Sequence, residues 1–229
     1  RVKELNIYAP PELKEIIYIQ LAAAKTELRF PLFFHEFGFD EPELLMENNE
    51  LIVQTIPLNH SLPCCGFLFK EKLKPRRMRK EKIQEFNISP EFIPSIKAGG
   101  DYILNDGTVL SHIELTRGAQ LPRSFAFCSD TKYYEKIIPQ ISGTDMLYHE
   151  ATFLDELKER ANQTFHSTAK DAATIALKSN VGKLIIGHYS QRYYDLNPLL
   201  FEARSIFSET YLALEGEKFD VKRKYDPDS

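Results

Sequence analysis

The chain has 229 residues, of which 43% are hydrophobic and 27% are charged, and its formal net charge at pH 7 is −4. This length and composition are those of an ordinary globular protein that buries one sizeable core. No apolar run approaches the roughly 18 residues that a membrane-spanning helix needs, so we expect no membrane partner. The cysteines are three, an odd number, which indicates free thiols in a reducing compartment such as the cytoplasm.

The first half of the chain predicts one helix and several short strands. Pro10 and Pro11 precede a helix that runs to about Lys25, because proline is tolerated in the first helical turn. Its apolar residues recur on one face: Leu13, Ile16, Ile17 and Leu21. Short β-branched and aromatic runs predict strands at residues 30–37, 50–58 and 66–71. A short helix follows over 78–86, and Asp106-Gly107 predicts a hairpin between strands at 101–104 and 108–113.

The second half alternates strands and helices. Strands are expected at residues 124–128, 145–149 and 183–187, of which the first and the last are expected to be buried. Helices are expected at residues 132–139, after Ser167 and from Asn197. Thr168 or Ser167 is suited to cap the helix that follows, and Asp171 in its first turn complements the helix dipole. This alternation predicts a mixed α/β fold in which helices cover a sheet.

Three of the predicted apolar strands end in one potential metal ligand each. His60 follows Leu58-Asn59, Asp130 follows Cys128-Ser129, and His188 follows Ile186-Gly187. A strand end delivers a side chain into a site while the strand behind it holds that side chain still. One such histidine is more often a core residue, but three of these residues together predict a site for a metal that prefers imidazole and carboxylate, such as zinc.

The residues around these strand ends resemble ribonuclease Z, the tRNA 3′-processing endonuclease of the metallo-β-lactamase fold. Five motifs occur in the order of that family: Pro57-Leu58-Asn59-His60, Ser129-Asp130-Thr131, Tyr148-His149-Glu150-Ala151-Thr152-Phe153, Phe165-His166-Ser167-Thr168 and Gly187-His188-Tyr189-Ser190-Gln191-Arg192-Tyr193. The resemblance implies a four-layer αββα sandwich. It also implies a single domain over residues 1–229, with an arm-like insertion at about 71–100.

The resemblance implies a role for each site residue. His60 is expected to bind one zinc ion, His188 a second one, and Asp130 to bridge the two ions of a complete subunit. His166 is expected to donate a proton to the leaving oxygen or to stabilise the phosphoryl charge. Glu150 is expected to hold His166 in the right tautomer. Residues alternate along a strand, so Glu150 rather than His149 is expected to face the site.

The defining signature of the resembled family, His-x-His-x-Asp-His, occurs nowhere in the 229 residues. The chain opens on Arg1, and residues 2–13 resemble the family segment that follows the signature. We therefore expect the chain to be the C-terminal three-quarters of a longer enzyme, incomplete at the N-terminus, and inactive by itself.

Basic residues cluster although the net charge is negative. Eight of the thirteen residues from 70 to 82 are Lys or Arg. A solvated surface is the ordinary explanation of such a run, but this one lies where the resembled family inserts its tRNA-gripping arm. Glu91-Phe92 stand where family arms often carry Gly-Pro. The residues expected to contact precursor tRNA phosphates are Lys74, Arg76, Arg77, Arg79, Lys80 and Arg192.

Two other functions stay open at this point. The fold hosts many hydrolases, so the chain could act as a phosphodiesterase or another hydrolase of small molecules. It could also be a non-catalytic binding module, because half of the expected ligands are absent. The basic run favours the tRNA enzyme, since a small substrate would not reach it. The resemblance also implies a homodimer.

Overall fold

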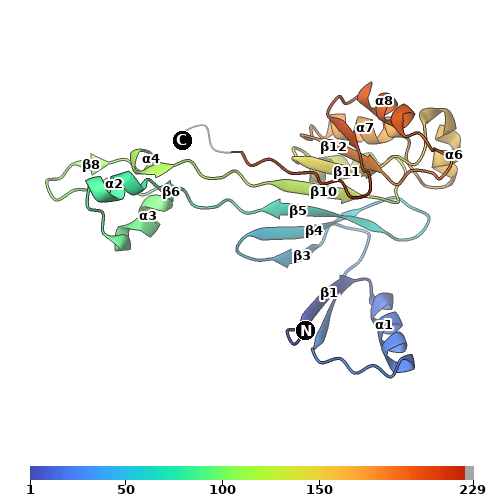
Figure 1. Cartoon of the computed structure of the whole chain (residues 1–229), viewed down its shortest axis with the longest axis horizontal. Coiled ribbons are helices and arrows are strands. Elements are labelled where there is room, and N and C mark those ends of the chain that lie inside the picture. The colour runs from blue at the N-terminus through green and yellow to red at the C-terminus, as the bar shows by residue number, and fades with distance from the viewer. Residues whose placement is uncertain (225–229) are drawn as a thin grey trace.

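The computed structural model describes residues 1–224, and its largest element is a mixed sheet of seven strands (Figure 1). The strand order is β13-β12-β11-β10-β5-β4-β3. The strands are β3 (Leu44–Glu47), β4 (Leu51–Pro57), β5 (Cys65–Glu71), β10 (Ser124–Cys128), β11 (Met146–Glu150), β12 (Leu184–Gly187) and β13 (Thr210–Leu212). Strands β10 to β13 run parallel, whereas β5, β4 and β3 pair antiparallel. The continuous apolar run of β12 is buried throughout, as is typical of a central parallel strand.

Helices cover one face of this sheet (Figure 1). They are α5 (Ile138–Ile141), α6 (Lys158–Gln163), α7 (Ala169–Lys178) and α8 (Asn197–Arg204). Thr168 caps α7 in a reciprocal capping box with Asp171, as the sequence predicts. Ala172, Ala173 and Ala176 are fully buried, so α7 lies close against the sheet. The main core lies in this layer, between the helices and the strand residues Ala126, Leu147 and Ile186.

The opposite face of the sheet is apolar. Side chains alternate along strands, so Phe125, Phe127, Tyr148 and Ile185 face away from the helices. Phe127 is 36% exposed and stacks on Tyr148, with ring centroids 4.6 Å apart. A cavity of about 530 Å³ lies on this face, beside Phe125 and Tyr148. The described residues thus build one large sheet with a helical layer on one side.

The first residues form a separate small unit. Strands β1 (Leu5–Ala9) and β2 (Leu32–Glu36) pair in parallel and are joined through α1 (Pro11–Ala23). The helix begins at the predicted proline, but its expected apolar face is not buried: Leu13 is 37% exposed and Ile16 is 49% exposed. Strand β1 was not predicted from the sequence.

Residues 72–123 leave the sheet after β5 and return to it at β10 as a projecting module (Figure 1). We call residues 77–117 its head, and residues 72–76 and 118–123 its stem. The head contains β6 (Arg77–Met78), α2 (Lys80–Glu85), α3 (Ile93–Lys97), β7 (Tyr102–Ile103), β8 (Val109–Leu110), α4 (His112–Leu115) and β9 (Thr116–Arg117). The head has its own small core of buried residues: Ile88, Ile96, Leu110 and Leu115. The module therefore extends beyond the range 71–100 expected for the insertion.

Two predicted elements differ from the structure. The helix expected over 132–139 is a 3₁₀ helix at Glu135–Ile137 followed by α5, which carries a proline in its first turn. The strand expected over 108–113 ends at Leu110, because the Ser111 hydroxyl accepts from the backbone N–H of Ile113 and so caps α4. Within residues 1–224, no helix combines the length and the apolar character needed to cross a membrane.

Candidate metal centre

The predicted site residues converge at the carboxyl ends of the parallel strands. Asp130 follows β10, Glu150 ends β11, and His188 directly follows β12. The carboxyl edge of parallel strands is the usual place for a site in an α/β sheet. Asp130 and His188 both have φ of 59°, in the left-handed region that few non-glycine residues adopt. Such backbone conformations cluster at functional sites, where the surrounding structure holds them.

A close backbone approach explains why glycine precedes His188. A Cβ at Gly187 would lie 2.3 Å from the Tyr148 hydroxyl oxygen, so any other residue there would force the Tyr148 ring to move. The glycine therefore allows β12 to pass the Tyr148 ring and to present His188 at the strand end.

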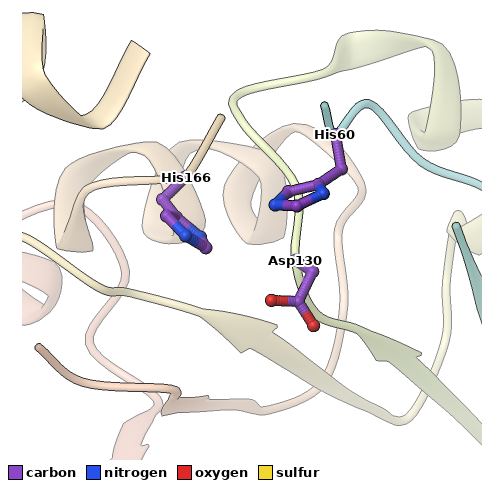
Figure 2. A group of neighbouring side chains, drawn as sticks. All are labelled: His60, Asp130 and His166. Atoms are coloured by element: carbon purple, nitrogen blue, oxygen red, sulfur yellow. The ribbon is translucent and has the colours of Figure 1, made fainter. Parts of the chain in front are cut away.

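Donor side chains from separate segments surround one space, and Figure 2 shows three of them, His60, Asp130 and His166. His188 Nε2 lies 3.3 Å from Asp130 Oδ1. The ring of His166 lies 5.5 Å from that of His60 and 5.2 Å from that of His188, between centroids. Within residues 1–224, two overlapping groups offer ligand atoms that all lie within 4.8 Å of one another: His60 with Asp130 and His166, and Glu150 with His166 and His188. The structure thus brings together all five residues expected in the metal and catalytic site.

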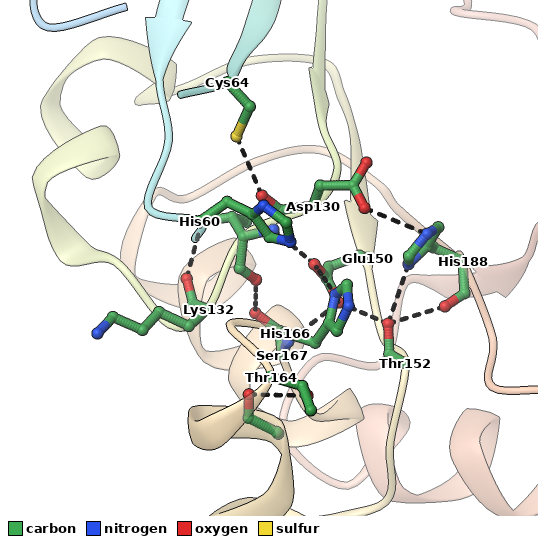
Figure 3. A network of polar contacts seen from close by, with 12 residues as sticks. His60, Cys64, Asp130, Lys132, Glu150, Thr152, Thr164, His166, Ser167 and His188 are labelled. Carbon is green, nitrogen blue, oxygen red and sulfur yellow. Dashed lines mark hydrogen bonds and ion pairs between the residues drawn. The ribbon is translucent and has the colours of Figure 1, made fainter. Parts of the chain in front are cut away.

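The Glu150 carboxylate is fully buried and receives hydrogen bonds from several directions (Figure 3). The backbone N–H groups of Thr131 and Ser167 donate to it at 2.5 Å and 3.0 Å, and the Thr152 hydroxyl donates at 2.6 Å. His166 Nδ1 lies 3.0 Å from Oε1 and 3.2 Å from Oε2. Burial alone would raise the pKa of this carboxyl, but the bonds from His166, Thr152 and Ser167 outweigh it and the pKa is lowered. Glu150 is thus a buried anion whose oxygens are already occupied.

The contact with Glu150 fixes His166. The bond to Glu150 raises the pKa of His166, against the opposing effect of burial. Because Nδ1 donates to the carboxylate, Nε2 faces the space between the other donors. The side chain of His166 is 18% exposed, so this nitrogen lies at an accessible but partly enclosed position.

Thr152 orients His188, a role that was not predicted from the sequence although Thr152 lies in one of the five family-like motifs. Its Oγ1 lies 3.1 Å from His188 Nδ1 and 2.9 Å from the His188 carbonyl oxygen. A hydroxyl has one proton. If that proton goes to Glu150, the shortest contact, the oxygen accepts from His188 Nδ1–H. The lone pair of His188 is then on Nε2, which faces Asp130. The Thr that ends the His-Glu-Ala-Thr motif was the available signal.

The other three histidines lie outside this cluster. The buried His149 directs Nδ1 to the backbone carbonyl of Glu150, at 2.8 Å. His35 contacts Asn6 and stacks on Tyr8. His112 lies in the head of the projecting module.

Two cations flank the cluster, each over an aromatic ring. The Arg192 guanidinium lies 5.0 Å from the centroid of Phe153, whose ring meets that of His166 edge-on. Lys132 Nζ lies 4.8 Å from the centroid of Phe165, whose ring meets that of His60 edge-on. Arg192, expected to bind RNA, is thus at the rim of the site. Lys132 was not singled out from the sequence.

The other residues expected to bind RNA lie on the projecting module, apart from the cluster (Figure 1). Arg77 and Lys80 are exposed. Arg76 Nε and Arg79 Nε donate to Thr116, to its hydroxyl at 2.7 Å and to its carbonyl at 2.9 Å. Lys74 forms an ion pair with Glu50 at 3.5 Å. The basic run is therefore divided between residues that hold the head together and residues that face solvent.

Comparison with known proteins finds relatives that are named ribonuclease Z. The chain is 46% identical to the ribonuclease Z of Cytophaga hutchinsonii, over 96% of this chain and 71% of the relative. It is 40% identical to the ribonuclease Z of Bacteroides thetaiotaomicron, over 99% of this chain and 73% of the relative. No family model matches the chain.

Solved structures share the fold at low identity. The short form of human tRNase Z matches 96% of this chain and 68% of its own length, with a TM-score of 0.60 and 20% identity. The metallo-β-lactamase fold protein YhfI from Bacillus subtilis matches 93% of this chain and 64% of its own length, with a TM-score of 0.57 and 16% identity. The fold of the chain is therefore that of metallo-β-lactamase proteins, as the sequence predicts.

Proposed function

The chain belongs to the ribonuclease Z family, and from this we propose that the protein is an endoribonuclease that removes the 3′ trailer from precursor tRNA. Identity of 46% over nearly the whole chain supports the family's activity over the other functions of the fold. The observation that carries the proposal is the convergence of His60, Asp130, His166 and His188 around the Glu150 carboxylate. A small-molecule hydrolase of this fold would have no use for the basic projecting module.

The donor set fits zinc. Three imidazoles and one carboxylate are ligands that zinc prefers, and a protein zinc site usually takes four donors. We assign His60, His188 and Asp130 as ligands, and Asp130 would be the ligand that two ions share in the complete enzyme. Zinc, when bound, would polarise the scissile phosphate and lower the pKa of an attacking water. The described donors are enough for one ion, and a second ion needs further ligands.

His166 and Glu150 are assigned to proton transfer. The buried carboxylate holds Nδ1 of His166, so that Nε2 is aimed at the substrate space. From there it would protonate the leaving 3′ oxygen or stabilise the charge on the phosphoryl group. The same arrangement, a carboxylate behind a histidine, also occurs behind metal-ligating histidines. The two roles differ in what the loss of His166 does to metal content.

The projecting module is assigned as the tRNA-gripping arm. Its solvent-facing Arg77 and Lys80 are the proposed phosphate contacts of the basic run. Arg192 is proposed to hold RNA at the rim of the site, where its guanidinium is exposed beside Phe153. Lys74, Arg76 and Arg79, expected earlier to bind RNA, have partners within the protein and are assigned to support the module.

The homodimer implied by the resemblance and the cytoplasmic location indicated by the three cysteines are kept as proposals. Light scattering coupled to size-exclusion chromatography tests the first, and subcellular fractionation tests the second.

Incubating the zinc-loaded full-length protein with a precursor tRNA that carries a 3′ trailer tests the activity. We expect one cut at the end of the acceptor stem, mapped by sequencing the product ends, and none with Asp130→Ala. If the protein hydrolyses bis-p-nitrophenyl phosphate but leaves precursor tRNA uncut, it is instead a small-molecule phosphodiesterase. Binding of precursor tRNA without any cleavage would indicate a non-catalytic module.

A further inference from the structure

The C-terminal segment formed by residues 221–224 lies beside the stem of the projecting module, far from these residues in sequence (Figure 1). We call it the strap. The backbone N–H of Leu121 donates to the carbonyl of Lys224 at 2.9 Å. Arg223 Nη1 donates to Gln120 Oε1 at 2.6 Å, and Arg123 Nη1 donates to the carbonyl of Val221 at 3.4 Å.

The strap also connects to the sheet. Lys224 Nζ forms an ion pair with Asp145 Oδ1 at 2.8 Å, just before β11 begins. Asp145 Oδ2 accepts from the backbone N–H of Ser124 at 2.9 Å, where β10 begins. The strap therefore ties the returning half of the stem to two strands whose far ends carry Asp130 and Glu150.

The two halves of the stem are held differently: the outgoing half contacts the β3–β4 turn, through the Lys72 N–H to the Glu50 carbonyl at 2.8 Å and through the Lys74–Glu50 ion pair. At the base of the stem Arg123 pairs with Glu71, and the two residues also exchange backbone contacts. Beyond that base, the returning half meets the strap through Gln120 and Leu121, and it joins the sheet to a head that has its own core. Ala119 and Gln120 in the stem are only 7% and 9% exposed, which shows that this half of the stem is packed rather than free.

We propose that the strap braces the stem and sets the position of the head relative to the metal centre, with Arg223 as a positioning residue for precursor tRNA. The proposal rests on the proposed function, because it assumes a substrate that touches the head and the centre together. Binding at two linked places is tightest when their separation is already correct, since less ordering is needed on binding. A substrate that touches only the centre gains nothing from the brace.

The test uses Arg223→Ala in the full-length protein, with Lys222→Ala as the matched control. Lys222 lies in the same strap, is exposed, and carries the same charge. We expect Arg223→Ala to raise KM for precursor tRNA about tenfold with little change in kcat. Hydrolysis of bis-p-nitrophenyl phosphate should not change. Arg223→Lys, which keeps a donor near Gln120, should restore part of the loss, and Lys222→Ala should behave as wild type.

Two further measurements separate a brace from a direct RNA contact. Hydrogen exchange should quicken at the Leu121 amide in Arg223→Ala, in the absence of RNA, and stay slow in Lys222→Ala. The salt dependence of precursor tRNA binding should keep its slope, because no phosphate contact is lost. The brace would be overturned if hydrogen exchange at Leu121 did not change in Arg223→Ala. It would also be overturned if the salt-dependence slope became smaller and Lys222→Ala lost as much precursor tRNA affinity as Arg223→Ala. If the wild-type protein does not cleave precursor tRNA, the proposed function fails, and the exchange result still decides whether the strap braces the stem.

Discussion

Some residues of the metal centre face the substrate space, and others hold those residues in position. His166 belongs to the first group in either of its two candidate roles, and the Glu150 carboxylate fixes it from behind. We predict that His166→Ala in the full-length protein lowers the rate of precursor tRNA cleavage by about 10²-fold or more while most of the metal stays bound. Asp130→Ala should remove both the cleavage activity and the bound metal.

Elemental analysis of each purified variant, beside its cleavage rate, decides between the roles. If His166→Ala loses metal as Asp130→Ala does, His166 is a ligand and the proton donor has to be sought elsewhere. Glu150→Gln is a useful companion, because it keeps the shape of the side chain and removes the charge that holds Nδ1.

Thr152 supplies a second residue-scale prediction. Its hydroxyl contacts both Glu150 and His188. Thr152→Val keeps the volume of the side chain and leaves His188 without its partner at Nδ1. Loss of such an outer partner typically weakens metal binding by about 10- to 100-fold. A competition titration with a zinc chelator measures this affinity. Thr174→Val, at a half-buried position of α7, removes a hydroxyl that donates to Lys170 in the same helix and should leave the affinity as in wild type.

At the scale of elements, the junction of β5 and β10 with the module is held by Glu71 and Arg123. The bonds from Arg123 lower the pKa of Glu71 to about 2. A carboxyl whose folded pKa is depressed stabilises the fold above its unfolded pKa of about 4.5, and this stabilisation is lost as the pH falls toward 2. Glu71→Gln should therefore cost about 1 kcal/mol at pH 7, since the pair is partly exposed.

Urea unfolding at pH 7, 5 and 3.5 tests this pH dependence. The difference between wild type and Glu71→Gln should stay constant from pH 7 to pH 5 and become smaller by pH 3.5. A difference that does not change with pH would mean that the charge of Glu71 contributes nothing. Glu15→Gln on the exposed surface of α1 is the matched control.

The elements that could be predicted from sequence are those with a strong local signal. The apolar runs of β10 and β12, the cap of α7 and the Asp106-Gly107 turn all carry that signal within a few residues. Strand β13 has three residues, and α6 has one buried residue, Ala161, so neither shows a usable period.

The metal centre shows the same difference between what a local sequence signal predicts and what it does not. The motifs identified its residues because each sits at the end of a strand or at a helix start. The link from Thr152 to His188 spans 36 positions, and the Arg76 contact with Thr116 spans 40. No local pattern records such contacts, because they form only after the sheet and the head are folded. The RNA-binding role of Arg76 was expected from its charge and from the place of the basic run in the resembled family, and neither signal records its bond to Thr116.

At the scale of the whole molecule, the head projects beyond the end of the sheet where β10 begins (Figure 1), whereas Asp130 of the metal centre follows the other end of β10. In the proposed function this distance separates RNA binding from chemistry. The exposed Arg77 and Lys80 are suited to phosphate contacts, whereas Arg79 supports the head through Thr116. We predict that Arg77→Ala with Lys80→Ala weakens precursor tRNA binding. It should also lower the slope of log affinity against log salt by about 2, because two fewer counterions are released.

The control for net charge is the double variant Lys3→Ala with Lys25→Asn, which removes two positive charges from the N-terminal unit. Asparagine is chosen at position 25 because Lys25 has a left-handed backbone, with φ of 48°. This pair should bind precursor tRNA with the wild-type slope. Arg79→Ala should instead lower the unfolding temperature of the head. Turnover of bis-p-nitrophenyl phosphate should be unchanged in the Arg77 and Lys80 variant, because that substrate reaches only the centre. An equal loss on both substrates would show that these residues support the fold or the centre, and the assignment of the projecting module as the tRNA arm would be wrong.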